Sequence, residues 1–162
     1  MKKEKHLQIS RLSKKYGSKH VVTGIDLEVR SGEVVGLLGP NGAGKTTTFS
    51  MVSGFTKPTQ GEILLNQNNI THLPPYKRAQ VGLVYLPQES SVFRKLTVED
   101  NIRAIAQTLK LGKSREDELV AHRLEELKLS SLAKQKAYTL SGGERRRLEI
   151  TRALVLNPDF LL

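Results

Sequence analysis

The 162-residue sequence contains no cysteine and no tryptophan. Without cysteine it forms neither disulfides nor thiolate metal sites, which suits a protein of a reducing compartment. Aromatic residues make up only 5% of the chain, so a surface of aromatic rings that stack on nucleic-acid bases is not expected. The longest apolar runs, such as Val34–Leu38, are far shorter than the roughly 20 residues that a membrane-spanning helix needs.

Positive charge is in excess, with 26 lysines and arginines against 16 acidic residues and a formal charge of +10. Such an excess is compatible with binding to nucleic acid or to an anionic membrane. Solvated charged faces explain it more simply, and no nucleic-acid-binding motif accompanies it. We therefore expect no nucleic-acid partner. The chain is long enough for one domain with its own core.

One stretch carries a specific chemical signal, because residues 39–47 match the phosphate-loop template G-x-x-x-x-G-K-[ST] without a mismatch. The preceding Glu33–Leu38 is expected to form a short buried strand, and Thr46–Val52 a helix. Glycines let backbone N–H groups turn toward phosphate oxygens, and the start of the helix adds its positive dipole end. The candidate nucleotide-binding residues of this loop are Gly39, Pro40, Asn41, Gly42, Ala43, Gly44, Lys45, Thr46 and Thr47.

Two side chains of the loop have defined roles in this template. The lysine ammonium binds the β- and γ-phosphates, and the hydroxyl that follows it ligates Mg²⁺. The sequence therefore predicts a site for a nucleotide and Mg²⁺, with Lys45 on the phosphates and Thr46 on the metal ion.

Alternation of apolar and polar residues predicts strands on both sides of the loop. Leu7–Leu12 has the pattern of a half-buried strand that ends in a turn at residues 14–18. Val21–Val29 is expected to be the next strand, with a bulge at Gly24. Further strands are expected at Glu62–Leu65 and, as a second buried strand, at Val81–Leu86, while Gly54 is expected to end the loop's helix.

A helical pattern replaces the strands from about residue 90. Ile102, Ile105, Ala106 and Leu109 share one face of a helix predicted over 98–109. A capping box at residues 114–117 predicts the start of a second helix, with Val120, Leu124 and Leu127 on its apolar side. A third helix is predicted from Arg145 to Leu156, with Leu148, Ala153 and Leu156 in a core and Arg145, Arg146 and Arg152 in solvent. The last residues, 160–162, are expected to begin a buried strand.

Residues 140–144 read Leu-Ser-Gly-Gly-Glu and follow the phosphate loop along the chain. Together and in this order, the two motifs resemble those of ABC-type ATPases, and the resemblance runs over the whole chain. It implies an α/β fold: a P-loop NTPase domain of the ABC type, with a RecA-like core, an antiparallel β part and a helical insertion. We expect a single domain whose parts are a β-rich phosphate-loop core at 1–89, a helical subdomain at 90–138, and the signature helix with the start of the next strand at 139–162.

The resemblance also implies roles outside the loop. Tyr16 matches the aromatic residue that stacks on adenine, and Gln88 matches the glutamine that senses Mg²⁺ and the γ-phosphate. The signature residues, which would bind the nucleotide held by a second subunit, are Leu140, Ser141, Gly142, Gly143 and Glu144. The implied ligands are ATP and Mg²⁺. The implied partners are a second copy or another ABC ATPase, and a membrane permease near Gln88, which would place the chain in the cytoplasm, peripheral on the inner membrane.

The detailed sequence at residues 36–49, 85–89, 93–94 and 140–150 is similar to the ATPase of bacterial lipopolysaccharide export systems. This predicts ATP hydrolysis that drives lipopolysaccharide export. ATPases of branched-chain amino-acid importers share the loop and the signature, but usually differ after the glutamine. The sequence is also compatible with an ABC ATPase that acts on nucleic acid and with a non-functional fragment. The cargo itself is recognised by permease subunits that are not in this chain.

The sequence departs from the family pattern at its end. After a strand like residues 160–162, the family continues to an Asp-Glu pair that holds Mg²⁺ and polarises the attacking water, and later to a switch histidine. All four histidines of this sequence precede residue 140, so none matches that switch. The general base is expected beyond Leu162, and no catalytic residue is assigned within the chain. The sequence therefore resembles a C-terminally truncated copy, which we expect to be inactive by itself.

Overall fold

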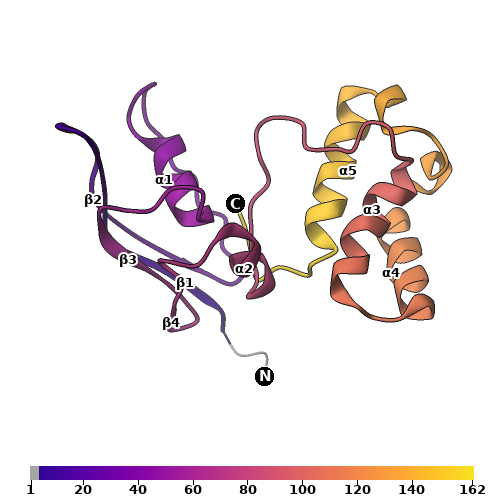
Figure 1. Ribbon diagram of the computed structural model, residues 1–162, viewed down its shortest axis with the longest axis horizontal. Helices are drawn as coiled ribbons and strands as arrows, with labels where there is room; N and C mark the ends of the chain where they lie inside the picture. The colour runs from indigo at the N-terminus through magenta and orange to yellow at the C-terminus, as the bar shows by residue number, and fades with distance from the viewer. Residues whose placement is uncertain (1–3) are drawn as a thin grey trace. The chain divides into compact units, whose positions relative to one another are not determined.

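The structure is a computed structural model that describes residues 4–162 and consists of two compact units (Figure 1). The first unit ends at Val84 and also includes Leu162, and the second runs from Tyr85 to Leu161. The elements of the first unit are β1 (His6–Tyr16), β2 (Lys19–Arg30), α1 (Lys45–Ser53), β3 (Gln60–Leu65), β4 (Asn68–Asn69), α2 (Pro75–Gln80) and β5 (Leu83–Val84).

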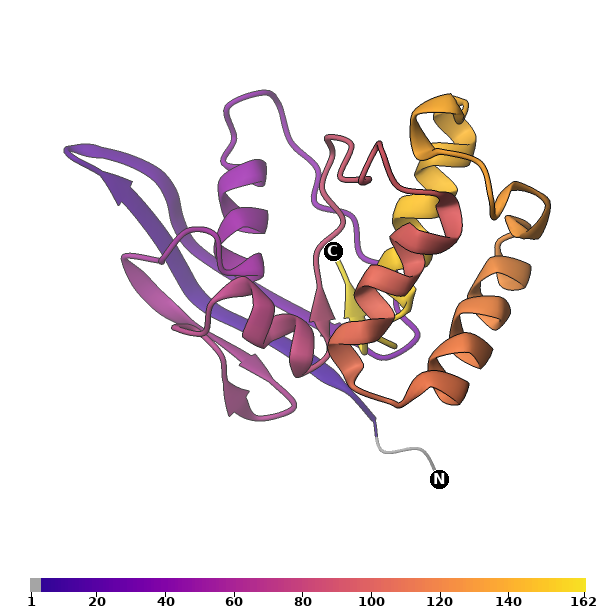
Figure 2. The ribbon, with the colours of Figure 1, turned by 45° about the vertical axis from the view of Figure 1, so that its right-hand side comes forward.

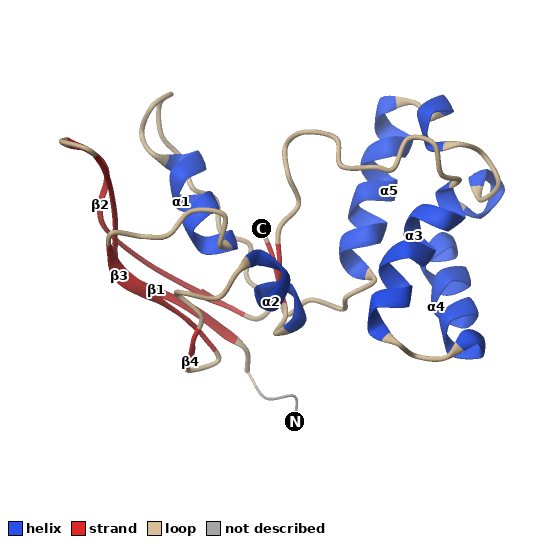
Figure 3. Ribbon diagram, in the orientation of Figure 1, coloured by secondary structure: helices blue, strands red, loops and turns tan. Residues whose placement is uncertain are grey.

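Four strands of the first unit form an antiparallel sheet in the order β2-β1-β3-β4 (Figure 3). Strand β1 is longer than predicted, because its pairing with β2 continues to Tyr16 opposite Lys19 and only residues 17–18 form the turn. The predicted bulge at Gly24 is confirmed by a shift of register between Ile25 and Val22 and by a φ of +61°.

Helix α1 lies over one face of this sheet in both views of the ribbon (Figures 1 and 2). The predicted helix is confirmed, and Gly54 ends it as expected, with a φ of +88° and its N–H donating to the carbonyl of Met51 at 3.2 Å. An apolar cavity separates the helix from the sheet. Its lining residues are Leu7, Ile9, Leu27, Val29, Val35, Gly36, Leu37, Thr48, Phe49, Val52 and Leu162.

The segment that enters the phosphate loop is not the predicted strand. Residues 33–38 have no regular secondary structure, and Val34 is 100% and Leu38 91% exposed. An apolar run becomes a strand only when a neighbour completes its hydrogen bonds, and within residues 4–162 no strand pairs with this segment. The strand predicted at Val81–Leu86 is likewise reduced to Leu83–Val84, where the carbonyl of Val84 accepts the N–H of Leu162 at 2.8 Å.

The second unit is mainly helical, with α3 (Val98–Ala106), α4 (Lys113–Glu126), α5 (Gly142–Leu154), short 3₁₀ turns at Gln107–Leu109, Ser130–Leu132 and Ala137–Thr139, and β6 (Phe160–Leu161). The three predicted helices are thus confirmed, with bounds that differ by a few residues. Their apolar faces meet in one core, whose buried residues are Val92, Val98, Ile102, Ala106, Val120, Leu124, Leu129, Ala137, Leu140, Leu148 and Val155.

The capping box predicted at the start of α4 is wrong. The helix begins one residue before Ser114, after Gly112, and no side chain caps it. Ser114 therefore lies inside the first turn, where its hydroxyl donates to Glu118 at 3.3 Å. A capping box is found instead at the start of α3, where Thr97 and Asp100 each accept the other's backbone N–H.

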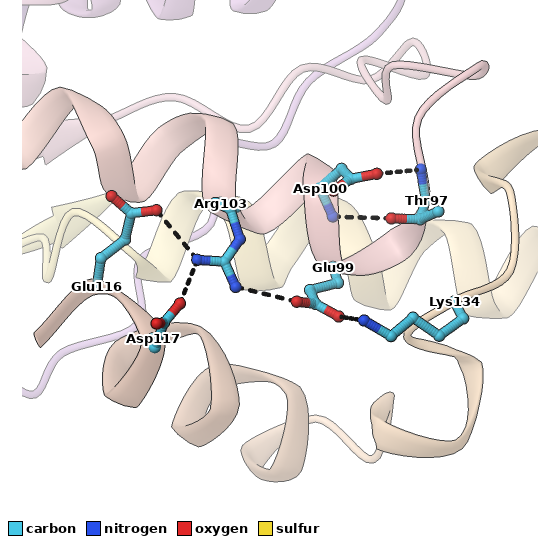
Figure 4. Close-up of polar contacts among 7 residues, drawn as sticks. All are labelled: Thr97, Glu99, Asp100, Arg103, Glu116, Asp117 and Lys134. Carbon is cyan, nitrogen blue, oxygen red and sulfur yellow. Dashed lines mark hydrogen bonds and ion pairs between the residues drawn. The ribbon is translucent and has the colours of Figure 1, made fainter. Parts of the chain in front are cut away.

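An ion-pair network joins α3 to α4 (Figure 4). Arg103 lies 2.9 Å from Glu99, 3.1 Å from Glu116 and 2.5 Å from Asp117. Glu99 also accepts from Lys134 at 2.6 Å. The bonds from Lys134 and Arg103 hold the pKa of Glu99 below its usual range, and those from the carboxylates raise the pKa of Arg103. The network fixes the two helices side by side.

Candidate functional site

The phosphate loop has a backbone that its glycines make possible. Gly42 and Gly44 have φ angles of +83° and +85°. A Cβ atom at Gly44 would lie 2.6 Å from the carbonyl oxygen of Val21 and 2.9 Å from a methyl of Val22. Gly44 therefore lets strand β2 approach the first turn of α1, as no other residue would.

Helix α1 begins at Lys45, directly after the loop, and its N-cap residue, Gly44, provides no side-chain cap. The first turn of a helix leaves backbone N–H groups without intrahelical partners, and it is the positive end of the helix dipole. Thr46 in this turn is exposed, and Thr47 is half-buried. The start of α1 therefore offers several donors to an anion.

The side chain of Lys45 folds back over the loop. Its ammonium donates to the carbonyl oxygens of Gly39 at 2.6 Å and of Pro40 at 2.7 Å. The structure therefore brings together the charged group and the N-terminus of α1 at one short loop, as the sequence predicted for a phosphate site. The roles of the individual loop residues stay predictions.

Tyr16 lies at the hairpin end of β1 and is 51% exposed. The ammonium of Lys14 lies 4.8 Å from the centre of its ring. The hairpin that carries Tyr16 is the one whose Val21 and Val22 contact Gly44. The predicted base-stacking residue and the phosphate loop thus belong to neighbouring parts of the first unit.

The signature motif forms the start of α5 in the second unit. Ser141 is the N-cap, accepting the N–H of Glu144 at 3.3 Å, while its own N–H and hydroxyl donate to the Glu144 carboxylate at 2.8 and 2.7 Å. These bonds with Ser141 lower the pKa of Glu144. Leu140 is buried in the helical core, whereas Gly142 and Gly143 are exposed, and a Cβ atom at either would meet open space. Packing among residues 4–162 therefore does not require glycine at 142 and 143.

Gln88 is exposed and lies beside the start of α5 within the second unit. The two contribute to one polar pocket, whose lining residues are Gln88, Ser90, Gly142, Arg145, Arg146 and Glu149. The structure thus brings the predicted Mg²⁺-sensing glutamine next to the first glycine of the signature motif.

Side chains of α5 contact the segment on both sides of Gln88. Arg146 donates to the carbonyl of Pro87 at 2.9 Å, and Arg152 donates to the carbonyl of Ser91. The guanidinium of Arg152 also lies 4.6 Å from the ring centre of Phe93. The prediction that Arg152 stays in solvent is wrong, because these two contacts draw it onto this segment.

Glu149, which no sequence motif assigns to a site, is the buried member of this group. It is 5% exposed, accepts the N–H of Ser91 at 3.1 Å and pairs with Arg146 at 3.1 Å. Burial acts to raise its pKa, but the bonds from Ser90, Arg146 and Ser91 outweigh burial and hold the pKa below its usual range. In the sequence, the only indication of its burial is that it directly follows Leu148, which was predicted to lie in the core.

The part of the chain that the structure describes contains no helix long and apolar enough to cross a membrane. Residues 4–162 also contain no cluster of three or more His, Asp or Glu side chains that would hold a metal ion.

Comparison with known proteins identifies the class. The ABC transporter family matches residues 22–162, and the chain belongs to this family. A solved ATP-binding cassette of an ABC transporter shares 30% identity and a TM-score of 0.85, covering 96% of this chain and 66% of that one. A second, cbiO1 of Clostridium perfringens, shares 28% identity and a TM-score of 0.83 over 96% of this chain and 63% of its own. The predicted ABC-type α/β fold is thus confirmed.

Among individual relatives, the lipopolysaccharide export system ATP-binding protein LptB of Acidithiobacillus ferridurans is 51% identical over 96% of this chain and 65% of its own length. LptB of Escherichia coli is 46% identical over the same shares. An ABC transporter ATP-binding protein of Rhizobium meliloti is 52% identical over 93% of this chain and 56% of its own. The chain thus spans 56–65% of the length of these relatives.

The carboxylate of Glu149 is expected to stabilise the second unit in a pH-dependent way. Its folded-state pKa is lowered, so its contribution is present above the ordinary pKa of 4.5 and is lost as pH falls through the folded value. At pH 7, Glu149→Gln should lower the free energy of unfolding by about 1–2 kcal/mol, and the difference from the unsubstituted protein should shrink as the pH falls below 4.5. Urea unfolding at several pH values measures both.

The matched control for this experiment is Glu125→Gln, which neutralises an exposed acid on α4. It should change the unfolding free energy little at any pH. A Glu149→Gln effect that is the same at pH 3 and pH 7 would show that the carboxylate charge does not hold this segment.

Proposed function

We propose that this chain binds ATP with Mg²⁺ as part of the ATP-binding subunit of an ABC transporter. The observation that carries this proposal is the start of α1, where uncapped backbone donors and the Lys45 ammonium lie at one glycine loop. The β- and γ-phosphates replace the carbonyls of Gly39 and Pro40 as partners of Lys45. The tyrosine ring at the hairpin end stacks on the base, and half of its surface is exposed for this contact.

The residues present fit a magnesium ion that arrives with the nucleotide. Mg²⁺ prefers oxygen ligands and is usually held through substrate phosphates, water and few protein groups. Thr46 offers an exposed hydroxyl in the first turn of α1, and we assign it to the ion. Gln88 stays a predicted further ligand. The ion would neutralise phosphate charge.

The signature motif supports a partner subunit. Gly142 and Gly143 lie at a helix N-terminus, and within residues 4–162 nothing lies within 4 Å of a Cβ atom placed on either of them. We propose that this end of α5, with Ser141, binds the γ-phosphate of a nucleotide held by a second copy or by another ABC ATPase. Two such contacts related by a two-fold axis close a dimer.

For the cargo, we propose lipopolysaccharide export, supported by 46–51% identity to relatives that are named for that system. The permease partner would dock on the segment after Gln88. Phe93 and Leu96 of this segment are 48% and 37% exposed. The protein would then work at the cytoplasmic face of the inner membrane.

Hydrolysis needs a carboxylate that polarises the attacking water. Glu144 is occupied by Ser141, and Glu149 by Ser91 and Arg146. Neither takes this role, so we propose that the ATPase activity of the family requires a residue outside this sequence.

The first test compares phosphate contacts with base contacts. Lys45→Ala should weaken ATP and inorganic triphosphate alike, by about 2–3 kcal/mol, because it removes one charge-assisted partner of the phosphates. Tyr16→Ala should weaken ATP only, because triphosphate has no base. Equilibrium binding of labelled ligands to folded protein measures both, and equal affinity of Lys45→Ala and the unsubstituted protein would contradict the proposal.

The second test concerns hydrolysis. Residues 1–162 expressed by themselves should release no phosphate from ATP beyond the level of the Lys45→Ala variant, which controls for contaminating ATPases. Phosphate release that disappears with Lys45→Ala would show that this sequence contains its own general base.

The third test concerns the membrane partner. In cells that contain the lipopolysaccharide-export permeases, the protein should sediment with membranes, and in cells without them it should remain in the supernatant. If the protein sediments with membranes that lack the permeases, and a salt wash releases it, its positive charge binds anionic lipid instead.

A further inference from the structure

The first unit contains a buried arginine at the far end of the phosphate-loop helix. Arg78 lies on α2 and is 1% exposed. An ionised side chain of this size is rarely buried without an opposite charge. Among the ion pairs of residues 4–162, none involves Arg78. Burial lowers its pKa to about 10, so the guanidinium remains charged at neutral pH.

Backbone carbonyls take the place of a counter-ion. Nη1 donates to Met51 at 2.8 Å and to Val52 at 2.6 Å. Nη2 donates to Thr71 at 2.8 Å, and Nε donates to Leu73 at 2.8 Å. The planar fork of the guanidinium thus joins three segments: the end of α1, the connection after β4 and α2 itself.

Met51 and Val52 belong to the last turn of α1, the helix that begins with Lys45. The last carbonyls of a helix lack intrahelical partners and form the negative end of its dipole. Arg78 therefore satisfies one end of α1, while the opposite end carries the phosphate loop. A helix of nine residues is about 13 Å long, and because it is stiff, a tilt at one end displaces the other.

Gly54 leaves room for this contact. A Cβ atom there would lie 2.8 Å from Nε of Arg78 and 2.9 Å from the carbonyl oxygen of Leu73. A larger residue at position 54 would therefore collide with the Arg78 side chain in the position from which it binds the carbonyls of α1.

We propose that Arg78 is a positioning residue for phosphate binding, because its hydrogen bonds to the last carbonyls of α1 hold Lys45 and the first turn of that helix in place. The inference rests on the proposed nucleotide site. Fixing the helix before the ligand arrives removes part of the ordering cost of binding, so its loss appears in the affinity for phosphates. Arg78 itself does not touch the ligand.

The experiment measures the Kd for the binding of inorganic triphosphate. The protein used is the full-length product of the gene. All measurements are made well below each variant's unfolding midpoint. Under these conditions a loss of stability alone leaves the Kd unchanged, so the readout separates positioning from a merely structural role. Arg78→Met should raise the Kd about tenfold, which corresponds to about 1.4 kcal/mol. Lys77→Met, which removes an exposed charge from the same helix, should leave it unchanged.

A second pair of variants keeps the arginine. Gly54→Ala places a methyl group against Nε of Arg78 and should weaken triphosphate binding in the same direction. Gly32→Ala is its control, since Gly32 has a similar φ of +87° but open space around a Cβ atom. This pair decides the question if Arg78→Met does not fold.

The outcomes separate the inference from the proposed function. If Lys45→Ala weakens binding but Arg78→Met and Gly54→Ala bind as the unsubstituted protein does, Arg78 is structural only and the inference is overturned. If Lys45→Ala has no effect, the nucleotide site itself is wrong, and the inference falls with it. Weakened binding in both Arg78→Met and Gly54→Ala, with both controls unchanged, supports the inference.

Discussion

The hydrogen bonds between Arg78 and the last carbonyls of α1 fix the end of the helix that lies farthest from the phosphate loop. Burying a guanidinium costs several kcal/mol of free energy. This cost is offset only when its N–H groups find hydrogen-bond acceptors. The structure comes close to this condition, because four of the five N–H groups donate to carbonyls from two segments, the end of α1 and the connection after β4. The opposite end of α1 has no side-chain cap and carries the Lys45 ammonium. Arg78 thus binds two of the last carbonyls of the helix, and the other end presents donors to an anion.

The helices that begin at the phosphate loop and at the signature motif differ in how their N-termini are capped. Helix α1 starts after Gly44 with no side-chain cap, whereas α5 starts with a reciprocal capping box between Ser141 and Glu144. The Ser141 hydroxyl already donates to a carboxylate whose pKa is lowered by that bond. A phosphate that takes this hydroxyl must therefore displace an ionised carboxylate of like charge. A contact through the Ser141 hydroxyl consequently requires this bond to Glu144 to break.

The features that the sequence predicted correctly are those that depend on local requirements of the backbone. The phosphate loop, the helix after it and its end at Gly54 depend on glycines and on one lysine at fixed spacing. Arg78 and Glu149 escaped prediction because their bonds join residues 27 and 58 positions apart. The four acceptors of Arg78 and the Ser91 donor of Glu149 are backbone groups, which nearly every residue provides, so no pattern of side chains indicates these bonds. The same reason explains why Arg152 was wrongly placed in solvent.

The predicted strand at residues 33–38 failed for a different reason. Its composition is typical of a strand that is covered on both faces. The pattern of side chains, however, indicates only that a segment favours burial. The segment becomes a strand when it pairs with a neighbouring strand. Val34 and Leu38 are instead exposed, and burying one such side chain would contribute about 1.5–3 kcal/mol. On the other side of the phosphate loop, Gly44 packs against β2, and the end of α1 is bonded to Arg78.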